Sequence, residues 1–402
     1  GLPNLHDPSW RQRNLKTSKN KNLTVPPILL KEKSSCFMSK SFYSKVTVLS
    51  RIGFLVIFLL SACAELGPAT LKGERSNYNI AVQRTNDEQL LLNLVRLKYR
   101  DTPLFLEVSS VASQFTLKTD ASVNAELPDT GLNIFKFGGG TTYQERPTVT
   151  YSPLQGDKFI KRVLSPVPIE TLSLLYHSGW SVERILQLCL QRMDSLKNAP
   201  GASGPTPKQA PQFEKFARVI KLFRTLQTRG VLEVALGAPH GVPGLVLQIS
   251  PKARDWTEVQ ELSGYLGTPP GQTQYFLSKL KAHDPGHIQV VTRSLLGIMF
   301  YLSQAVEAPE SHIKSGKVTT TRLESGEKFD WSLVTGDLLR IRSQSTAPST
   351  ASVVIYYRDH WFYVEDSDLN SKSTFSLLAQ LFALQAGDIK DVSPMLTLPI
   401  GG

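Results

Sequence analysis

Hydrophobic positions recur with a helical period after residue 84. Four leucines at three- and four-residue spacing would share one helix face, which predicts a core-facing helix over residues 86–100. These are Leu90, Leu91, Leu94 and Leu97. Thr85 or Asn86 is suited to cap its start, and residues 101–103, which include Pro103, are suited to end it.

Between residues 104 and 151 the pattern changes to alternating apolar and polar positions, which is typical of strands. The predicted strands are 104–108, 113–118, 121–127, 132–137 and 141–151. Such alternation predicts antiparallel pairing with one solvated face.

Helical and strand-like runs then alternate to the end of the chain. Helices are predicted at 159–164, 169–177, 181–196, 211–229, 257–266, 275–282, 294–306 and 372–386. Hairpins are predicted from 231–236 with 245–250 and from 352–357 with 360–365, together with a strand at 287–291. Because no regular strand–helix–strand unit repeats, we expect an α+β fold in which antiparallel hairpins alternate with helices, in one or two subdomains.

Composition divides the chain into five segments. Residues 1–37 form an upstream extension, residues 38–62 a leader, residues 63–197 an N-terminal α+β region and residues 211–402 a C-terminal one. Between the two regions, residues 198–210 are rich in Pro, Gly and Ser, which predicts a linker or a long surface loop.

The segment from Met38 to Cys63 has the arrangement of a secretory signal peptide, with a basic start, an apolar run and small residues. The apolar run at 52–60 would measure about 14 Å as a helix, against a hydrocarbon layer of about 30 Å. Leu60, Ser61, Ala62 and Cys63 resemble the lipobox of bacterial lipoproteins. The resemblance implies that the Cys63 thiol receives lipid carrying palmitate-type acyl chains and becomes the first residue of the mature protein.

The same resemblance implies a compartment. In lipoproteins, an Asp after the acylated cysteine commonly retains the protein at the inner membrane, whereas this chain has Ala64. We therefore expect an outer-membrane lipoprotein that faces the periplasm. The polar, basic residues 1–37 precede a complete leader with its own Met38, so they are either an over-extended reading frame or a disordered basic extension.

Charge is concentrated in the leader and the extension. The first 62 residues hold ten Lys or Arg and two acidic residues, so they carry +8 of the formal +11 and leave +3 for the rest. A body so close to neutral lacks the positive field that phosphate binding requires, so we expect no nucleic-acid partner. Cys189 is the one cysteine left if Cys36 is removed and Cys63 is lipidated; it lies in an apolar helical pattern and is expected to be buried.

Catalytic signatures are absent from the sequence: it has no nucleophile elbow, zinc-protease, phosphate-loop or dinucleotide-binding motif. The sequence therefore favours a protein without enzymatic activity and predicts no cofactor. His283, Asp284 and His287 form a cluster that either binds a metal or is an ordinary turn around Pro285 and Gly286, and it lacks a third protein ligand at a recognised spacing.

The predicted hairpin at 352–365 is rich in aromatic residues. Tyr356, Trp361 and Tyr363 either form a surface that binds a protein partner or pair across the strands within the core. The segments 86–103 and 357–363 are similar to a family of uncharacterised bacterial lipoproteins, a resemblance that implies no activity and no catalytic residues.

Together these features predict a lipid-anchored protein with a structural or protein-interaction role in the cell envelope, bound to the membrane through its lipid and to an envelope protein. The alternative is a lipid-anchored periplasmic enzyme or ligand-binding protein.

Overall fold

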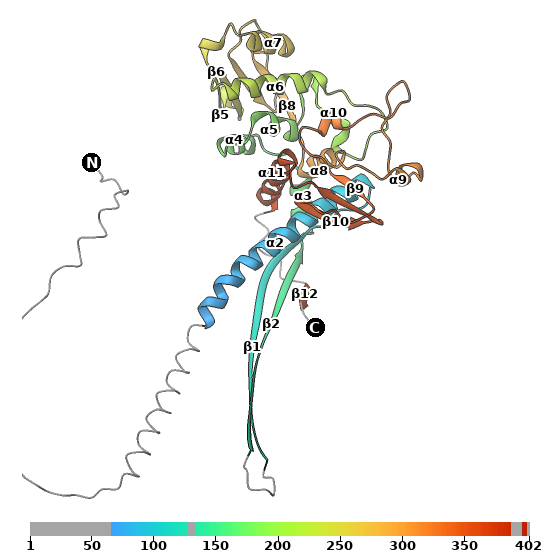
Figure 1. Cartoon of the computed structure of the whole chain (residues 1–402). Helices are drawn as coiled ribbons and strands as arrows, with labels where there is room; N and C mark the ends of the chain where they lie inside the picture. Colours follow the sequence, from blue (N-terminus) through green and yellow to red (C-terminus); the bar gives the residue numbers. More distant parts are fainter. Residues whose placement is uncertain (1–65, 127–133, 387–395, 400–402) are drawn as a thin grey trace, which may run out of the picture. The chain divides into compact units, whose positions relative to one another are not determined.

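A computed structural model describes residues 66–126, 134–386 and 396–399 (Figure 1). The upstream extension, the leader and Cys63 lie outside these residues, so the predictions for them stay predictions. Contacts divide the chain between Glu74 and Arg75, and apart from the first residues of helix α2 the elements described below belong to the second unit.

Helix α2 (Leu66–Lys98) begins earlier than predicted. Residues 74–84 contain neither Gly nor Pro, so nothing interrupts the helix there, and the Thr85 hydroxyl donates to the Val82 carbonyl at 2.9 Å instead of capping a helix start. The four leucines of the predicted stripe are buried, as expected. The helix ends where Arg100 adopts a positive φ of 62°.

Two amide side chains of α2 join it to the start of the first strand. Asn93 exchanges two hydrogen bonds with the backbone of Leu104, at 2.7 and 3.0 Å, and Gln89 exchanges two with Leu106, at 3.0 and 2.6 Å. These bonds satisfy backbone groups that no neighbouring strand reaches.

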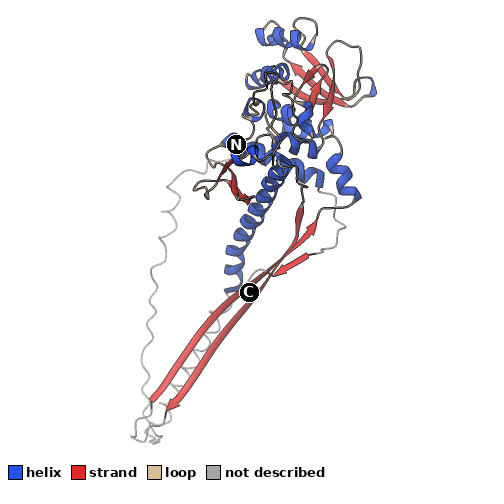
Figure 2. Cartoon of the chain, turned by 90° about the vertical axis from the view of Figure 1, so that its right-hand side faces the viewer, coloured by secondary structure: helices blue, strands red, loops and turns tan. Residues whose placement is uncertain are grey.

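The predicted short strands of residues 104–151 merge into two long ones, β1 (Leu106–Glu126) and β2 (Ile134–Pro153) (Figure 2). They pair antiparallel, as predicted, with a single irregularity between Val108 and Ser110. The predicted breaks were wrong because backbone pairing continues through the Ser, Thr and Gly positions. A short strand, β12 (Leu396–Pro399), pairs with β2 at residues 148–151.

A six-stranded sheet has the order β4-β3-β8-β7-β6-β5. Its strands are β3 (Leu190–Met193), β4 (Leu196–Lys197), β5 (Leu232–Gly237), β6 (Gly244–Ile249), β7 (Gln274–Ser278) and β8 (His287–Thr292). The predicted hairpin from 231 to 250 is therefore confirmed as β5 and β6. All neighbouring pairs are antiparallel except β7 and β8, which are parallel.

One predicted helix is wrong, and another is shorter than predicted. Residues 275–282 contain β7 instead, and Tyr275, Phe276 and Leu277 are all buried. A strand buried on both faces loses its alternation, so its apolar run is not distinguished from a buried helix. The helix predicted at 181–196 is α5 (Val182–Cys189), which has the expected Ser181 cap but ends where β3 begins.

The predicted linker at 198–210 packs into the unit. It contains the short helix η2 (Pro200–Ser203), and Ala199 and Ala202 are fully buried. The segments on its two sides also share one sheet, since β3 pairs with β8. Residues 198–210 therefore do not separate two folded regions.

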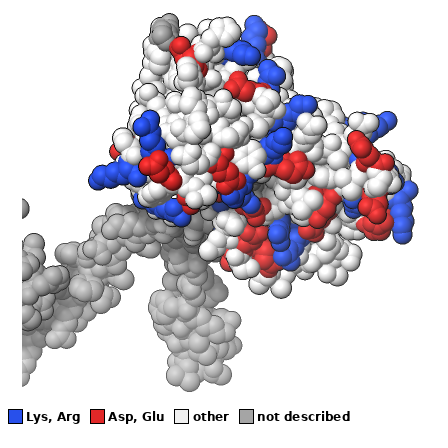
Figure 3. All heavy atoms as spheres, turned by 90° about the horizontal axis from the view of Figure 1, so that it is seen from above, with Lys and Arg blue, Asp and Glu red and all other residues white. Residues whose placement is uncertain are grey.

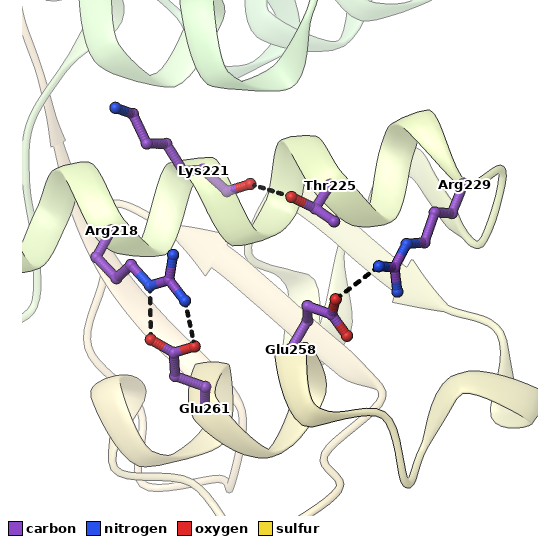
Figure 4. A network of polar contacts seen from close by, with 6 residues as sticks. All are labelled: Arg218, Lys221, Thr225, Arg229, Glu258 and Glu261. Carbon is purple, nitrogen blue, oxygen red and sulfur yellow. Dashed lines mark hydrogen bonds and ion pairs between the residues drawn. The ribbon is translucent and has the colours of Figure 1, made fainter.

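The remaining helices follow the predictions, except for two short helices at 310–314 and 332–335 that were not predicted. They are α3 (Asp157–Leu164), α4 (Ile169–His177), α6 (Glu214–Thr228), α7 (Thr257–Leu266), α8 (Leu295–Ser303), α9 (Glu310–Lys314), α10 (Ser332–Thr335) and α11 (Leu369–Ala386), with η3 (Pro239–Gly241) and η4 (Pro251–Ala253) as short turns. Helices α4 and α6 contact the sheet, and α7 contacts α6. Figure 4 shows two ion pairs between α6 and α7, Arg218 with Glu261 at 2.6 Å and Arg229 with Glu258 at 2.9 Å.

A second small sheet has the order β10-β11-β9. Its strands are β9 (Arg342–Gln344), β10 (Val353–Tyr357) and β11 (His360–Val364), which confirms the hairpin predicted at 352–365. Antiparallel sheets combined with helices confirm the α+β class. Within the described residues no helix combines the length and apolarity needed to cross a bilayer.

Candidate functional site

The C-terminal end of α2 meets the turn between β10 and β11. The Tyr357 hydroxyl donates to Oδ2 of Asp101 at 2.6 Å, and Nη2 of Arg358 donates to both carboxylate oxygens, at 3.1 and 2.9 Å. Desolvation raises the pKa of the Asp101 carboxyl, but these hydrogen bonds outweigh it, so the pKa lies below its ordinary value. The segments 86–103 and 357–363 are thus in contact.

The turn itself has an unusual backbone. Arg358 and Asp359 have positive φ angles of 49° and 66°, and they connect the paired residues Tyr357 and His360. Positive φ at both central positions suits the twist of a two-residue hairpin, although Asn and Gly adopt it more easily. The bonds from Arg358 to Asp101 therefore help to hold a turn that its own residues disfavour.

Tyr99 and His312 extend this cluster inward. The Tyr99 hydroxyl lies 2.7 Å from Nδ1 of His312, and the His312 ring packs 4.8 Å from that of His360. Burial raises the pKa of Tyr99 to about 12 and, together with nearby Lys317, lowers that of His312, so both are neutral at pH 7. The polar groups of this cluster hydrogen-bond to one another. The cluster therefore stabilises the fold and does not present an exposed nucleophile.

A cleft of about 570 Å³ lies beside the same end of α2. Lys98 contributes to its wall and is only 6% exposed, and its Nζ donates one hydrogen bond, of 3.3 Å, to Oε1 of Gln304. Desolvation, together with the nearby charge of Lys328, lowers the amine pKa to about 8. An ammonium group has three donors, so this cleft can hold a ligand that supplies acceptor oxygens.

Lys98 was missed in the sequence although a signal existed. It follows Leu94 by four residues, which places it on the buried face of the predicted helix. A lysine on an otherwise apolar stripe marks a buried charge, and such groups often lie at functional sites.

An apolar groove of about 690 Å³ lies between α2 and the β10–β11 hairpin. Its apolar lining consists of Leu92, Leu104, Leu106, Tyr151, Val354, Ile355, Tyr356 and Trp361, with Arg84, Glu88 and Arg96 among its polar residues. Leu104 is 49% exposed and Tyr356 55% exposed, so large apolar side chains face solvent here. Groups of such residues commonly mark binding surfaces.

The predicted aromatic surface is partly present. Tyr356 and Trp361 pair across the strands with ring centroids 5.0 Å apart, and both line the groove. Tyr363 is buried, and its hydroxyl donates to Gln344 of the neighbouring strand β9 at 3.1 Å. The third strand therefore removes Tyr363 from the surface on which the sequence placed it.

The histidine cluster forms a turn before β8. His283 and Asp284 are exposed, whereas Nε2 of His287 lies 2.7 Å from the Ser278 hydroxyl and 3.0 Å from the Leu280 carbonyl. The ring of His287 thus connects β7 to β8. In the part of the chain that the structure describes, no three His, Cys, Asp or Glu side chains form a group that could hold a metal ion.

Arg293 and Cys189 lie at the centre of the unit. Arg293 is fully buried, and its guanidinium donates to the carbonyls of Gln187, Leu188, Leu190 and Asn198 and to the Ser203 hydroxyl. It thereby fixes the end of α5 and the segment predicted as a linker. Cys189 is buried as expected, and burial raises its thiol pKa to about 12, which leaves it unreactive.

Basic and acidic side chains are interspersed on the face shown in Figure 3. That face has no extended area of a single sign, in agreement with the near-neutral charge of the body. The chain matches no protein-family profile, no curated protein and no solved structure.

Proposed function

We propose that the chain is a lipoprotein of the bacterial outer membrane, anchored through Cys63 and facing the periplasm, with a protein-binding role in the cell envelope. The leader at 38–62 and its lipobox-like end support the anchorage. The groove between α2 and the β10–β11 hairpin is the observation that carries the binding role.

The groove suits an apolar segment of another envelope protein. The paired rings of Tyr356 and Trp361 offer the kind of aromatic contact that dominates binding energy at protein interfaces. Arg96 among its lining residues can contact the carboxylates or carbonyls of a partner backbone. The described clusters of polar groups support catalysis less well, because Tyr99, Asp101 and His312 already bind protein groups.

Anchorage is tested by mass spectrometry of the N-terminal peptide from purified membranes. The expected species is a mature chain that begins at a triacylated or diacylated Cys63. The Cys63→Ala variant should keep its leader, because the lipoprotein pathway requires the thiol. An unmodified Cys63 in a chain that still carries residues 52–60 would contradict the proposal.

Partner binding is tested with a photo-crosslinking amino acid at Leu104 in living cells, and at Leu236 as a control. Both side chains are about half exposed, at 49% and 52%, but Leu236 lies on β5 outside the groove. We expect a defined adduct from position 104 alone, which the Trp361→Ala variant reduces by at least tenfold, since loss of an interface anchor costs about 2 kcal/mol or more. Adducts that are identical at both positions, or indifferent to Trp361, would refute the groove as a binding site.

The cleft at Lys98 favours a second function, the binding of a small carboxylate. A buried ammonium with one long hydrogen bond is better satisfied when a ligand oxygen joins it. Succinate, citrate and acetate are suitable probes, and any that binds should raise the melting temperature of the wild type but not of Lys98→Met. Equal shifts in both proteins, or none, would exclude this function for these acids.

A further inference from the structure

The two long strands of the β1–β2 hairpin place apolar and polar residues on opposite faces. Directly paired residues of antiparallel strands share a face, and the register is unbroken from Ser110 with Thr150 to Glu126 with Ile134. One face carries Val111, Phe115, Leu117, Ala121, Val123 and Ala125 of β1 and Phe135, Phe137, Tyr143 and Val149 of β2. That face also carries Ser113, Thr119 and Thr141, so the sequence defines a mainly apolar face along most of the hairpin.

Charged positions are distributed unequally between the faces. The opposite face carries Lys118, Asp120, Glu126, Lys136 and Arg146, together with Gln114, Thr116, Ser122, Asn124, Thr142 and Gln144. The apolar face carries one charge, Glu145, at the end nearer the start of β1. Between Leu117 and Ala125, and between Phe135 and Tyr143, that face carries none.

The uncharged part of the apolar face has the length of a membrane-spanning strand. From Leu117 to Ala125 each strand contributes nine residues, and a tilted strand crosses the hydrocarbon layer with about 9–11 residues. Aromatic positions lie at both ends, Tyr143 at one and Phe135 with Phe137 at the other, while Thr119, Ala121 and Gly139 lie between them. Aromatic residues at both interfaces and alternation between them are features of lipid-exposed strands.

We propose that the β1–β2 hairpin inserts into a lipid bilayer, with the face that carries Leu117, Val123 and Phe137 against the hydrocarbon. The proposal deepens the envelope role proposed above and does not depend on lipidation of Cys63. Continuity with the groove supports it, because Tyr151 lines the groove and occupies the same face of β2 as Val149 and Tyr143.

Insertion has a consequence for assembly. Among the described strands, β1 pairs only with β2, and β2 meets β12 only at residues 148–151. In hydrocarbon, unpaired N–H and C=O groups at a strand edge have no water to bind. Inserted hairpins therefore pair edge to edge with hairpins of further copies of this chain.

The test places single cysteines in the mature chain and labels them with a fluorophore sensitive to polarity. Cys189 is buried and does not compete for the label, and Cys63→Ala removes the other thiol of the mature chain. Positions 117, 121 and 123 lie on the apolar face, and positions 116, 118 and 122 on the polar face. Vesicles of phosphatidylethanolamine and phosphatidylglycerol contain lipids with a nitroxide on the acyl chain, which quenches a fluorophore in the hydrocarbon layer.

We expect quenching at 117, 121 and 123 and at least threefold less at 116, 118 and 122. Phe137 pairs with Val123, which is two residues from position 121 on the same face, so Phe137→Asp should abolish quenching at position 121. Thr142→Asp, on the polar face, should not change it. Thermal unfolding of both variants checks that the remaining fold is intact. Vesicle binding without quenching at any position would refute insertion while leaving the lipid anchor standing. If labels on the apolar face report a nonpolar environment in the absence of vesicles, insertion is refuted, and a second copy of the chain covers that face.

Discussion

The hydroxyl of Tyr357 donates a 2.6 Å hydrogen bond to Asp101, which precedes it by 256 residues. Arg358 binds the same carboxylate at 2.9 Å, so the end of α2 and the β10–β11 turn are held by a single acidic group. Arg96 of the groove and Lys98 of the cleft lie within five residues of Asp101 along the chain, so loss of this contact should alter both.

Asp101 should make stability depend on pH in the acid range. Its pKa is lowered in the folded protein and about 3.9 in the unfolded chain. Its contribution is therefore complete above about pH 4 and is lost as the pH falls through the folded pKa. In urea denaturation at pH 7, Asp101→Asn should cost about 1 kcal/mol, because the site is partly solvated.

The pH series of the same variant is the sharper measurement. Between about pH 4 and pH 2 the unfolding free energy of Asp101→Asn should fall less steeply than that of the wild type. Asp366→Asn is the control, since Asp366 pairs with Lys372 at a more exposed site. If the two variants behave alike, the Asp101 contact does not contribute as described.

Arg293 should be among the least replaceable residues of the unit. Arg293→Met fills a similar volume but leaves buried carbonyls of α5 and of the 187–198 segment without donors. Breaking such a buried network typically costs about 3–5 kcal/mol. Arg229→Met is the matched control, because Arg229 makes a surface ion pair and should cost no more than about 1 kcal/mol. Similar denaturation midpoints for both variants would show that Arg293 is dispensable.

Lys98 should make stability rise with pH, as Asp101 does, but in the alkaline range instead of the acid range. Its pKa falls to about 8 in the folded protein, compared with 10.5 for an ordinary lysine. Between these values the unfolded chain binds more protons, so the stability of the wild type should rise from pH 8 to pH 10 relative to that of Lys98→Met. Denaturation of both proteins across this range measures the difference. A constant difference would mean that the Lys98 amine is solvated.

Substitutions of Tyr363 and Tyr356 should show which of the two residues belongs to the core and which to a binding surface. Tyr363 is 8% exposed and Tyr356 is 55% exposed, although both belong to one small sheet. Tyr363→Ala should cost about 3–5 kcal/mol through the cavity that it leaves. Tyr356→Ala should change stability by less than about 1 kcal/mol while weakening partner crosslinks. Equal losses of stability would place Tyr356 in the core.

Local patterns predicted the elements whose signals are local. The leucine stripe of α2, the starts of the helices predicted from 181 and 294 and the β5–β6 hairpin all depend on residues close in sequence. The helix prediction at 275–282 was wrong because both faces of β7 are covered, and the residues that cover them are not close in sequence. The packing of residues 198–203 also has no local signal, because Arg293, about ninety residues later, binds the Asn198 carbonyl and the Ser203 hydroxyl.

The candidate site was harder to predict for the same reason. Tyr356 and Trp361 were identified from composition, but the helix that forms the other wall of their groove begins far away in the sequence. The pairing of Asp101 with Tyr357 carries no local signature at all. Spacing alone could have indicated Lys98, because it continues the stripe of Leu94.

The six-stranded sheet also constrains the order in which the protein can fold. Strand β3 has β8 as its partner about one hundred residues later in the chain, so the sheet cannot be completed until Thr292 has emerged from the ribosome or from a secretion channel. Late, non-local pairing of this kind slows folding and leaves strand edges open in the meantime. A nascent chain that stops before residue 287 should therefore remain sensitive to protease, and an export route that keeps the chain unfolded until synthesis is complete would suit this topology.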